Sequence, residues 1–197
     1  MNTKRKRKVW GIGFGVFIVL GIAFISWYYP LSPLSIHQSF TYHPSSEMHN
    51  GKTYEEEVGQ FKAAYEKDLD KDVKSENHNP TVNRTQYILP TFEQQWLLGT
   101  ESKTIDKDQL DQIFLDVQQA RNTLLSLVSE GDYSREERVY LVDSINAFLE
   151  LEDSVRMIRN GKYFSRSDLQ RMLGTVRGDF RASFNHYTTV FYDVSHK

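Results

Sequence analysis

Three alternating carboxylates, Asp68, Asp70 and Asp72, resemble the opening of a calcium-binding loop, because spaced acidic side chains can surround a hard cation. The rest of that pattern is missing. Val73 occupies the position that requires glycine, and Asn79 occupies the position of the final bidentate carboxylate. The aspartates also continue a helical pattern that would spread them around the helix axis. We therefore predict a solvated, charged helix end and no metal at this place.

His37, His43 and His49 recur every six residues, with Glu47 between the last two. Zinc requires three or four ligands held in a tetrahedron, and a segment rich in proline and serine does not hold them. The chain also has no cysteine, no G-x-S-x-G, no H-E-x-x-H and no glycine-rich phosphate loop. We therefore expect no cofactor, no metal and no catalytic residue, and predict that the protein is not an enzyme.

Arg177 and Arg181 lie one helical turn apart and share a face. Guanidinium groups bind carboxylates and phosphates, so this pair is a candidate site for an acidic partner or a cell-wall polymer. Pairing within the chain is the favoured alternative, because charges on helix surfaces usually find partners there. For these two arginines and for Arg156, Arg159 and Arg171, the candidate partners within the chain are Glu150, Glu152, Asp153 and Asp179.

An aromatic segment outside the long predicted helices is the strongest candidate for partner binding. Its large apolar residues are Tyr87, Ile88, Leu89, Phe92, Trp96, Leu97 and Leu98. A short helix from Pro90 to Leu98 would place Phe92 and Trp96 on one face. The partner-binding hypothesis uses Tyr87, Leu89, Phe92 and Trp96. A lid over one end of the core is the favoured alternative, because an exposed apolar patch of this size is a liability.

The first of the elements that position these residues is a predicted membrane helix. It is predicted because the 21 residues from Val9 to Tyr29 are almost all apolar. Such a helix spans about 31 Å, enough for a hydrocarbon core of about 30 Å. Five basic residues precede it and predict a cytoplasmic N-terminus: Lys4, Arg5, Lys6, Arg7 and Lys8. Aromatic residues that prefer the membrane interface flank it: Trp10, Trp27, Tyr28 and Tyr29.

A cleaved signal peptide is the alternative, because Gly21-Ile22-Ala23 has the small-residue spacing of a cleavage site. An uncleaved signal-anchor is favoured, since the apolar run continues past Ala23 and is longer than a signal peptide requires. Gly11 and Gly15 form a small-xxx-small pattern that lets two membrane helices approach closely. A homodimer through these two glycines is therefore a further arrangement that the sequence allows.

Charge and composition restrict the classes of partner. The formal charge is −2, and the first eight residues contribute +5, so the rest of the chain carries −7. A mildly acidic domain lacks the basic surface that nucleic acid requires, so we expect no nucleic-acid partner. An extracytoplasmic domain without cysteine is typical of bacterial envelope proteins, and a Gram-positive cell fits best.

Helical periodicity dominates the remaining sequence and predicts an all-α fold. After a linker at residues 30–52, a Thr53–Glu56 capping box begins a charged helix that ends near residue 74. Residues 75–104 are irregular, with proline and glycine as breaks. Three long helices then follow: the first begins at about Asp106, the second is capped by Ser134 and the third by Ser165 or Ser167. Short connections between them predict an antiparallel three- or four-helix bundle.

These patterns divide the chain into a basic tail at 1–8, a transmembrane helix at 9–29, the linker at 30–52, a charged helix with the aromatic segment at 53–104 and a three-helix core at 105–197. The leading hypothesis is a non-catalytic, single-pass envelope protein whose helical domain binds a protein partner. The alternative is a sensor or small-ligand-binding bundle that signals through a separate membrane protein. An enzyme acting on envelope polymers would need convergent carboxylates, which sequence cannot show.

Overall fold

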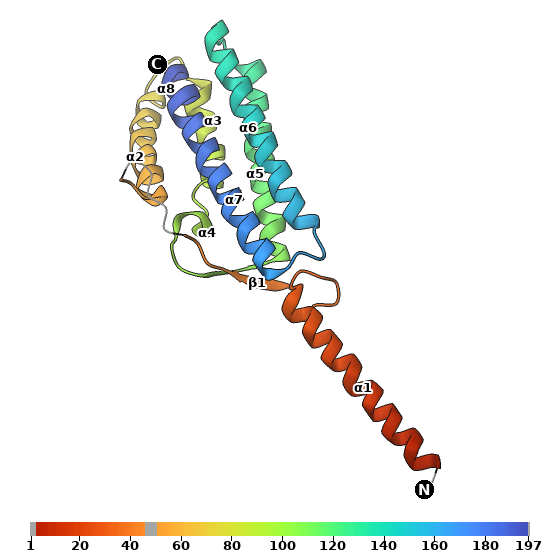
Figure 1. The fold of residues 1–197 in the computed structure, drawn as a ribbon. Coiled ribbons are helices and arrows are strands. Elements are labelled where there is room, and N and C mark those ends of the chain that lie inside the picture. Colours follow the sequence, from red (N-terminus) through yellow and green to blue (C-terminus); the bar gives the residue numbers. More distant parts are fainter. Residues whose placement is uncertain (1–2, 46–50, 197) are drawn as a thin grey trace.

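The computed structural model describes residues 3–45 and 51–196, with side chains described from Ile12 onward. The protein is mostly helical, in agreement with the predicted all-α class (Figure 1). Glu47 and His49 lie outside the described residues, so the predictions that involve them have no structural counterpart.

Helix α1 (Thr3–Tyr28) projects away from the other helices, which together form the helical body (Figure 1). Its large apolar side chains from Ile12 to Tyr28 are mostly exposed. Among the residues that the structure describes, no helix combines the length and apolarity that crossing a membrane requires.

Two short strands were not predicted from the sequence. Strand β1 (Ser39–Tyr42) pairs antiparallel with β2 (Lys103–Asp106), and Phe40 lies opposite Ile105. Leu31, Phe40 and Tyr42 are buried in the core. The expected linker is therefore wrong for this part of residues 30–52, because its apolar side chains pack into the helical body and its backbone forms a ribbon.

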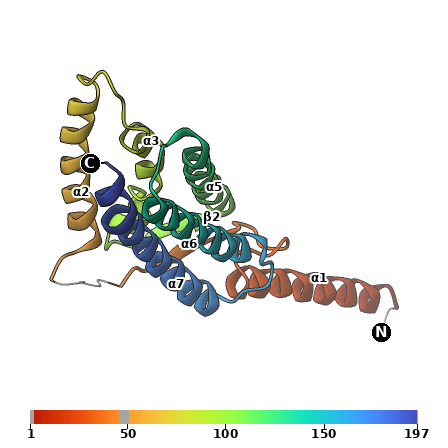
Figure 2. The same cartoon turned by 90° about the horizontal axis from the view of Figure 1, so that it is seen from above.

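The charged helix α2 (Tyr54–Asp72) begins at the predicted capping box, with Thr53 and Glu56 bonding each other's backbone N–H. Residues 75–104 contain more structure than predicted. They form α3 (Pro80–Ile88), a 3₁₀ turn (Leu89–Thr91) and α4 (Gln95–Leu98). Helix α3 lies between α2 and α5 in both views (Figure 1, Figure 2).

Helices α5 (Lys107–Glu130), α6 (Arg135–Asn160) and α7 (Arg166–Asn185) lie side by side (Figure 2). The predicted caps are confirmed at Ser134 and Ser165, and Asp106 caps α5 by accepting from the backbone N–H of Gln109. After α7 the chain continues through a π-helical stretch (His186–Tyr192) into the short α8 (Asp193–Ser195). The π turns carry Tyr187 and Phe191 into the core, next to α3 and Tyr133.

One core joins the strands with the helices of the helical body from α2 to the π-helical stretch. It contains the predicted apolar stripes of α5, α6 and α7, together with residues from β1, β2 and the aromatic segment. A buried charge also lies between α5 and α6, where Glu152 pairs with Arg121 at 2.7 Å and with Arg156. These helices and strands fix the surfaces that are described next.

Candidate interaction surfaces

The aromatic segment is inside the protein. The Phe92 ring packs edge-to-face against Phe148 of α6 and Phe184 of α7, with ring centroids 5.5 and 5.2 Å apart. The Trp96 ring packs against Phe180, and its indole N–H donates to Gln94 Oε1. Edge-to-face packing is a stable arrangement for buried rings.

Partner binding by Leu89, Phe92 and Trp96 is therefore contradicted, since all three side chains are buried. Of the four residues in that hypothesis, Tyr87 alone is exposed. The favoured alternative, a lid, describes the segment better. The segment fills space between α6, α7 and β1, because rings of this size stabilise the fold more by burial than by exposure.

Arg177 holds the loop after α4 in place. Its Nε donates to the carbonyl oxygen of Leu97 at 3.0 Å, and its Nη2 donates to that of Gly99 at 3.1 Å. Its Nη1 donates to the carbonyl of Ser45 at 2.8 Å. Three of the five N–H donors of this guanidinium group are therefore bound to carbonyl oxygens within the chain.

Arg181, one turn further along α7, forms a two-pronged ion pair with Glu57 of α2. The Nη2–Oε1 and Nε–Oε2 distances are 2.8 and 2.9 Å, and both side chains are about 15% exposed. The charge is thus paired within the chain, as favoured from sequence. The partner of Arg181 comes from α2, whereas the expected partners Glu152 and Asp153 pair with Arg156.

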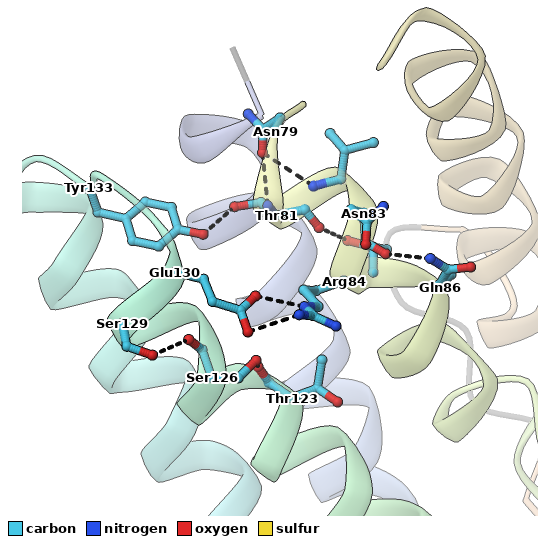
Figure 3. Close-up of polar contacts among 12 residues, drawn as sticks. Asn79, Thr81, Asn83, Arg84, Gln86, Thr123, Ser126, Ser129, Glu130 and Tyr133 are labelled. Atoms are coloured by element: carbon cyan, nitrogen blue, oxygen red, sulfur yellow. Dashed lines mark hydrogen bonds and ion pairs between the residues drawn. The ribbon is translucent and has the colours of Figure 1, made fainter. Parts of the chain in front are cut away.

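A polar network ties α3 to the α5–α6 connection (Figure 3). Arg84 of α3 makes a bidentate pair with Glu130 at the end of α5, at 2.7 and 2.8 Å. The Thr81 and Tyr133 hydroxyls lie 2.8 Å apart, and Asn79 caps α3 by accepting from the backbone N–H of Thr81. Burial raises the pKa of the Tyr133 hydroxyl, so it stays protonated and able to donate.

Gly131 makes room for this arrangement. A Cβ atom at position 131 would lie 2.1 Å from Cε2 of the Tyr133 ring, far inside van der Waals contact. The glycine therefore lets the ring fold back over the end of α5. In this position Tyr133 forms both the edge of the polar network and the wall of a groove.

The groove lies at the start of α6 and has a volume of about 600 Å³. Its walls are formed by Tyr133, Arg135, Arg138, Val139, Val142 and Asp143. Val139 and Val142 are half exposed, at 51% and 50%, and Val128 near the end of α5 is exposed as well. This end of the helical body is opposite α1 (Figure 1). We call it the distal groove.

Exposed valines flanked by two arginines and an aspartate are suited to binding an apolar side chain with charged neighbours. One pattern in the sequence indicates the groove. Val139 and Val142 do not belong to the buried stripe of α6, which runs from Leu141 to Ile158. Apolar residues beside a complete stripe indicate a second apolar surface.

A polar cleft of about 430 Å³ lies between α2, α3 and the C-terminal turn. The Tyr192 hydroxyl donates to Asp68 Oδ2 at 3.3 Å, and the backbone N–H of Asn79 donates to Asp72 Oδ1 at 2.5 Å. His196 lies 3.7 Å from Asp68. Asp72 is therefore not solvated as predicted, because it is buried and ties the start of α3 to α2.

Of the three histidines that recur every six residues, the structure describes His37 and His43. Within residues 3–45 and 51–196, no three His, Asp or Glu side chains are placed to hold an ion together. His43 Nδ1 lies 2.6 Å from the Ser102 hydroxyl, which accounts for its position beside β1.

The residues expected at the membrane fall into two groups. Nothing is described for the side chains of Lys4, Arg5, Lys6, Arg7, Lys8, Trp10 and Gly11. Trp27 and Tyr28 end α1 with exposed rings, and the Tyr29 ring lies 6.1 Å from that of Tyr163. The outer aromatic cluster therefore contacts the connection between α6 and α7.

No protein-family model, curated protein or solved structure matches this chain. The functional argument consequently depends on the surfaces described above.

Proposed function

We propose that this protein is a non-catalytic, single-pass envelope protein, with α1 as its signal-anchor and the helical body outside the cytoplasm. The observation that carries the proposal is the exposed apolar surface of α1. Phe14, Phe17 and Phe24 are each more than 60% exposed on a helix that leaves the helical body. In water such a surface would drive aggregation, whereas in a bilayer it is solvated.

Length and charge support the same arrangement. The apolar run of the sequence begins at Val9, before the described side chains, and ends at Tyr29. The five basic residues of the tail favour the cytoplasmic side. A Cβ atom added at Gly13 or Gly15 would meet nothing within 4 Å, so this face of α1 has room for a second helix. A homodimer through Gly11 and Gly15 remains part of the proposal.

We further propose that α5, α6 and α7 act as an antiparallel bundle, which α2 and α3 cover on one side. Its task is to hold the distal groove away from the membrane surface. The partner is a protein of the envelope that inserts an apolar side chain between Val139 and Val142 and pairs its charges with Arg135, Arg138 and Asp143. Binding at a small groove would depend on a few central contacts.

In-cell photocrosslinking tests this proposal. A photoreactive residue in place of Val142 should give one reproducible adduct with an envelope protein, because the groove contacts the partner directly. Met157 is the matched control, since it lies on the same helix and is similarly exposed, at 60%. The adduct should also disappear in Val139→Asp, which puts a charge into the groove.

Identical adducts from the two positions, or none from either, would contradict the groove as the binding surface. Stability of Val139→Asp should be measured alongside, and should change by about 0.5 kcal/mol or less because the side chain is half exposed. A loss of the adduct can then be assigned to the surface and not to unfolding.

Small-ligand binding is the second candidate, and the polar cleft beside Asp68, Asp72 and His196 is the observation that favours it. The carboxylates of Asp68 and Asp72 that line this cleft suit a small organic cation. Thermal unfolding with and without putrescine tests this candidate. A rise in the midpoint that is lost in Asp68→Asn would support it, and no rise would argue against it.

A further inference from the structure

The end of the helical body nearest α1 carries an exposed apolar patch of its own. Leu34 and Ile36, in the turn after α1, are 57% and 70% exposed, and Tyr163, between α6 and α7, is 66% exposed. Trp27 of α1 is also exposed. We call Trp27, Leu34, Ile36 and Tyr163 the base patch. Its members come from three segments, so its existence cannot be read from any single stretch of sequence.

The turn that carries Leu34 and Ile36 is fastened to α1. The Ser26 hydroxyl donates to the carbonyl oxygen of Leu34 at 3.4 Å, and the backbone N–H of Ile36 donates to the Ser26 hydroxyl at 3.1 Å. Leu31 and Ser32, just before, are buried. The two exposed side chains are thus held beside the last turn of α1.

The connection between α6 and α7 reaches the same place from the other side. Arg166 Nε donates to the carbonyl oxygen of Trp27 at 2.6 Å. The Tyr163 ring is linked to α1 through Tyr29, with an edge-to-face contact at 6.1 Å between ring centroids. Position 163 is therefore placed at the end of α1 by direct contacts, and the neighbouring Lys162 is exposed.

The composition of the base patch matches the interface of a bilayer. Two aliphatic side chains, a tryptophan and a tyrosine lie beside a lysine, and amphipathic rings and lysines prefer the headgroup region. The patch also adjoins the apolar surface of α1, since Trp27 belongs to both. A lipid surface that surrounds α1 would therefore reach the patch as well.

We propose that the base patch is a second membrane contact. Leu34, Ile36 and Tyr163 insert into the headgroup region of the outer leaflet, with Lys162 at the lipid phosphates. The helical body then stands on the membrane in a fixed orientation, and the distal groove faces away from it. This inference depends on the proposed anchoring by α1, because without it no bilayer surrounds the end of that helix.

Depth measurement by fluorescence quenching tests the inference on the full-length protein. The chain has no cysteine, so single variants can be labelled cleanly with an environment-sensitive dye: Ile36→Cys, Tyr163→Cys, Phe17→Cys and Val128→Cys. Each is placed in vesicles of phosphatidylcholine and phosphatidylglycerol. The vesicles contain lipid with a nitroxide either near the headgroup or near the bilayer centre.

We expect the dyes at positions 36 and 163 to be quenched roughly twofold more strongly by the nitroxide near the headgroup than by the deep one, because interfacial side chains lie about 5–10 Å into the boundary region. The Phe17→Cys label should show the reverse order, and the Val128→Cys label should show no quenching. Circular dichroism on each labelled variant confirms that it is folded.

In one outcome, the dyes at positions 36 and 163 behave like the dye at 128 while the dye at 17 is buried in lipid. That result would overturn the base patch as a membrane contact and leave the anchoring intact. A dye at 17 that also reports water would overturn the anchoring by α1. The two failures are therefore distinguishable in one set of measurements.

Discussion

Single arginines connect parts of this protein that are far apart in sequence. Arg177 reaches Leu97, Gly99 and Ser45, and Arg181 reaches Glu57. Sequence spacing correctly placed both arginines on one face of a helix. It could not identify their partners, because those lie about 80 to 130 positions away and are brought close only by the packing of α7 against other elements.

Replacing Arg177 by methionine should destabilise the protein by about 1.5–3 kcal/mol, since hydrogen bonds from a charged group are lost and partly buried carbonyls are left unpaired. Urea unfolding of the full-length protein in detergent measures this. Arg171→Met is the control, because Arg171 is exposed and pairs only with its helix neighbour Asp168 among the contacts described for it. Equal losses for the two variants would contradict the role given to Arg177.

Asp179 makes stability depend on pH in a defined direction. Partial burial, and then the nearby charge of Glu150, raise the pKa of its carboxyl group, although a hydrogen bond from Ser154 opposes the shift. A raised folded-state pKa means that the folded protein binds the proton more tightly than the unfolded chain. The contribution of Asp179 to stability is therefore present at low pH and lost as pH rises through the folded-state pKa.

Asp179→Asn should accordingly be more stable than the natural protein at neutral pH, by about 1 kcal/mol or less because the site is partly solvated. The advantage should shrink as pH falls through the pKa of Asp179. Thermal unfolding at several pH values checks the trend, with the exposed Asp132→Asn as control. If Asp179→Asn gained stability relative to the natural protein as pH falls, instead of losing it, the predicted sign would be wrong.

At the scale of elements, the sequence was most informative where the signal is local. The capping boxes at Thr53 and Ser134 were predicted and are confirmed, because each depends on two residues three positions apart. Helix α3 was missed although Asn79 and Pro80 form a normal helix start, since its nine residues are mostly polar and show no long stripe.

The ribbon of β1 and β2 was missed for a different reason. Four-residue strands are too short to show alternation, and each strand is stabilised by a partner about 65 positions away. The same applies to the aromatic segment. The spacing of Phe92 and Trp96 indicated a shared face, but whether that face looks toward solvent or toward Phe148 and Phe184 depends on tertiary packing.

The ribbon predicts a large effect of one substitution. Phe40→Ala should cost about 3–5 kcal/mol, because a fully buried ring opposite Ile105 is replaced by a cavity. Thr41→Ala, at an exposed position of the same strand, is the matched control. Chemical denaturation of both variants gives the difference. A small cost for Phe40→Ala would mean that residues 39–42 are the loose linker expected from sequence.

At the scale of the whole molecule, two surfaces lie at opposite ends. α1 is at one end, next to the base patch, and the start of α6, whose residues line the distal groove, is at the other (Figure 1). This polarity is what a membrane-anchored interaction module requires, because the anchor fixes the position and the groove stays accessible. The apolar character of α1 could be predicted from sequence, and the exposed Val139 and Val142 beside the buried stripe of α6 indicated the groove. The base patch could not be predicted, since it combines residues from separate elements.

The central claim is that α1 crosses the membrane with the helical body outside. Cysteine labelling in intact cells tests it most directly, because any engineered cysteine is the only one in the chain. A membrane-impermeant maleimide should label Val142→Cys in intact cells and Thr3→Cys only after the membrane is permeabilised. Labelling of Thr3→Cys in intact cells with Val142→Cys protected, or recovery of the protein outside the membrane fraction, would contradict the account.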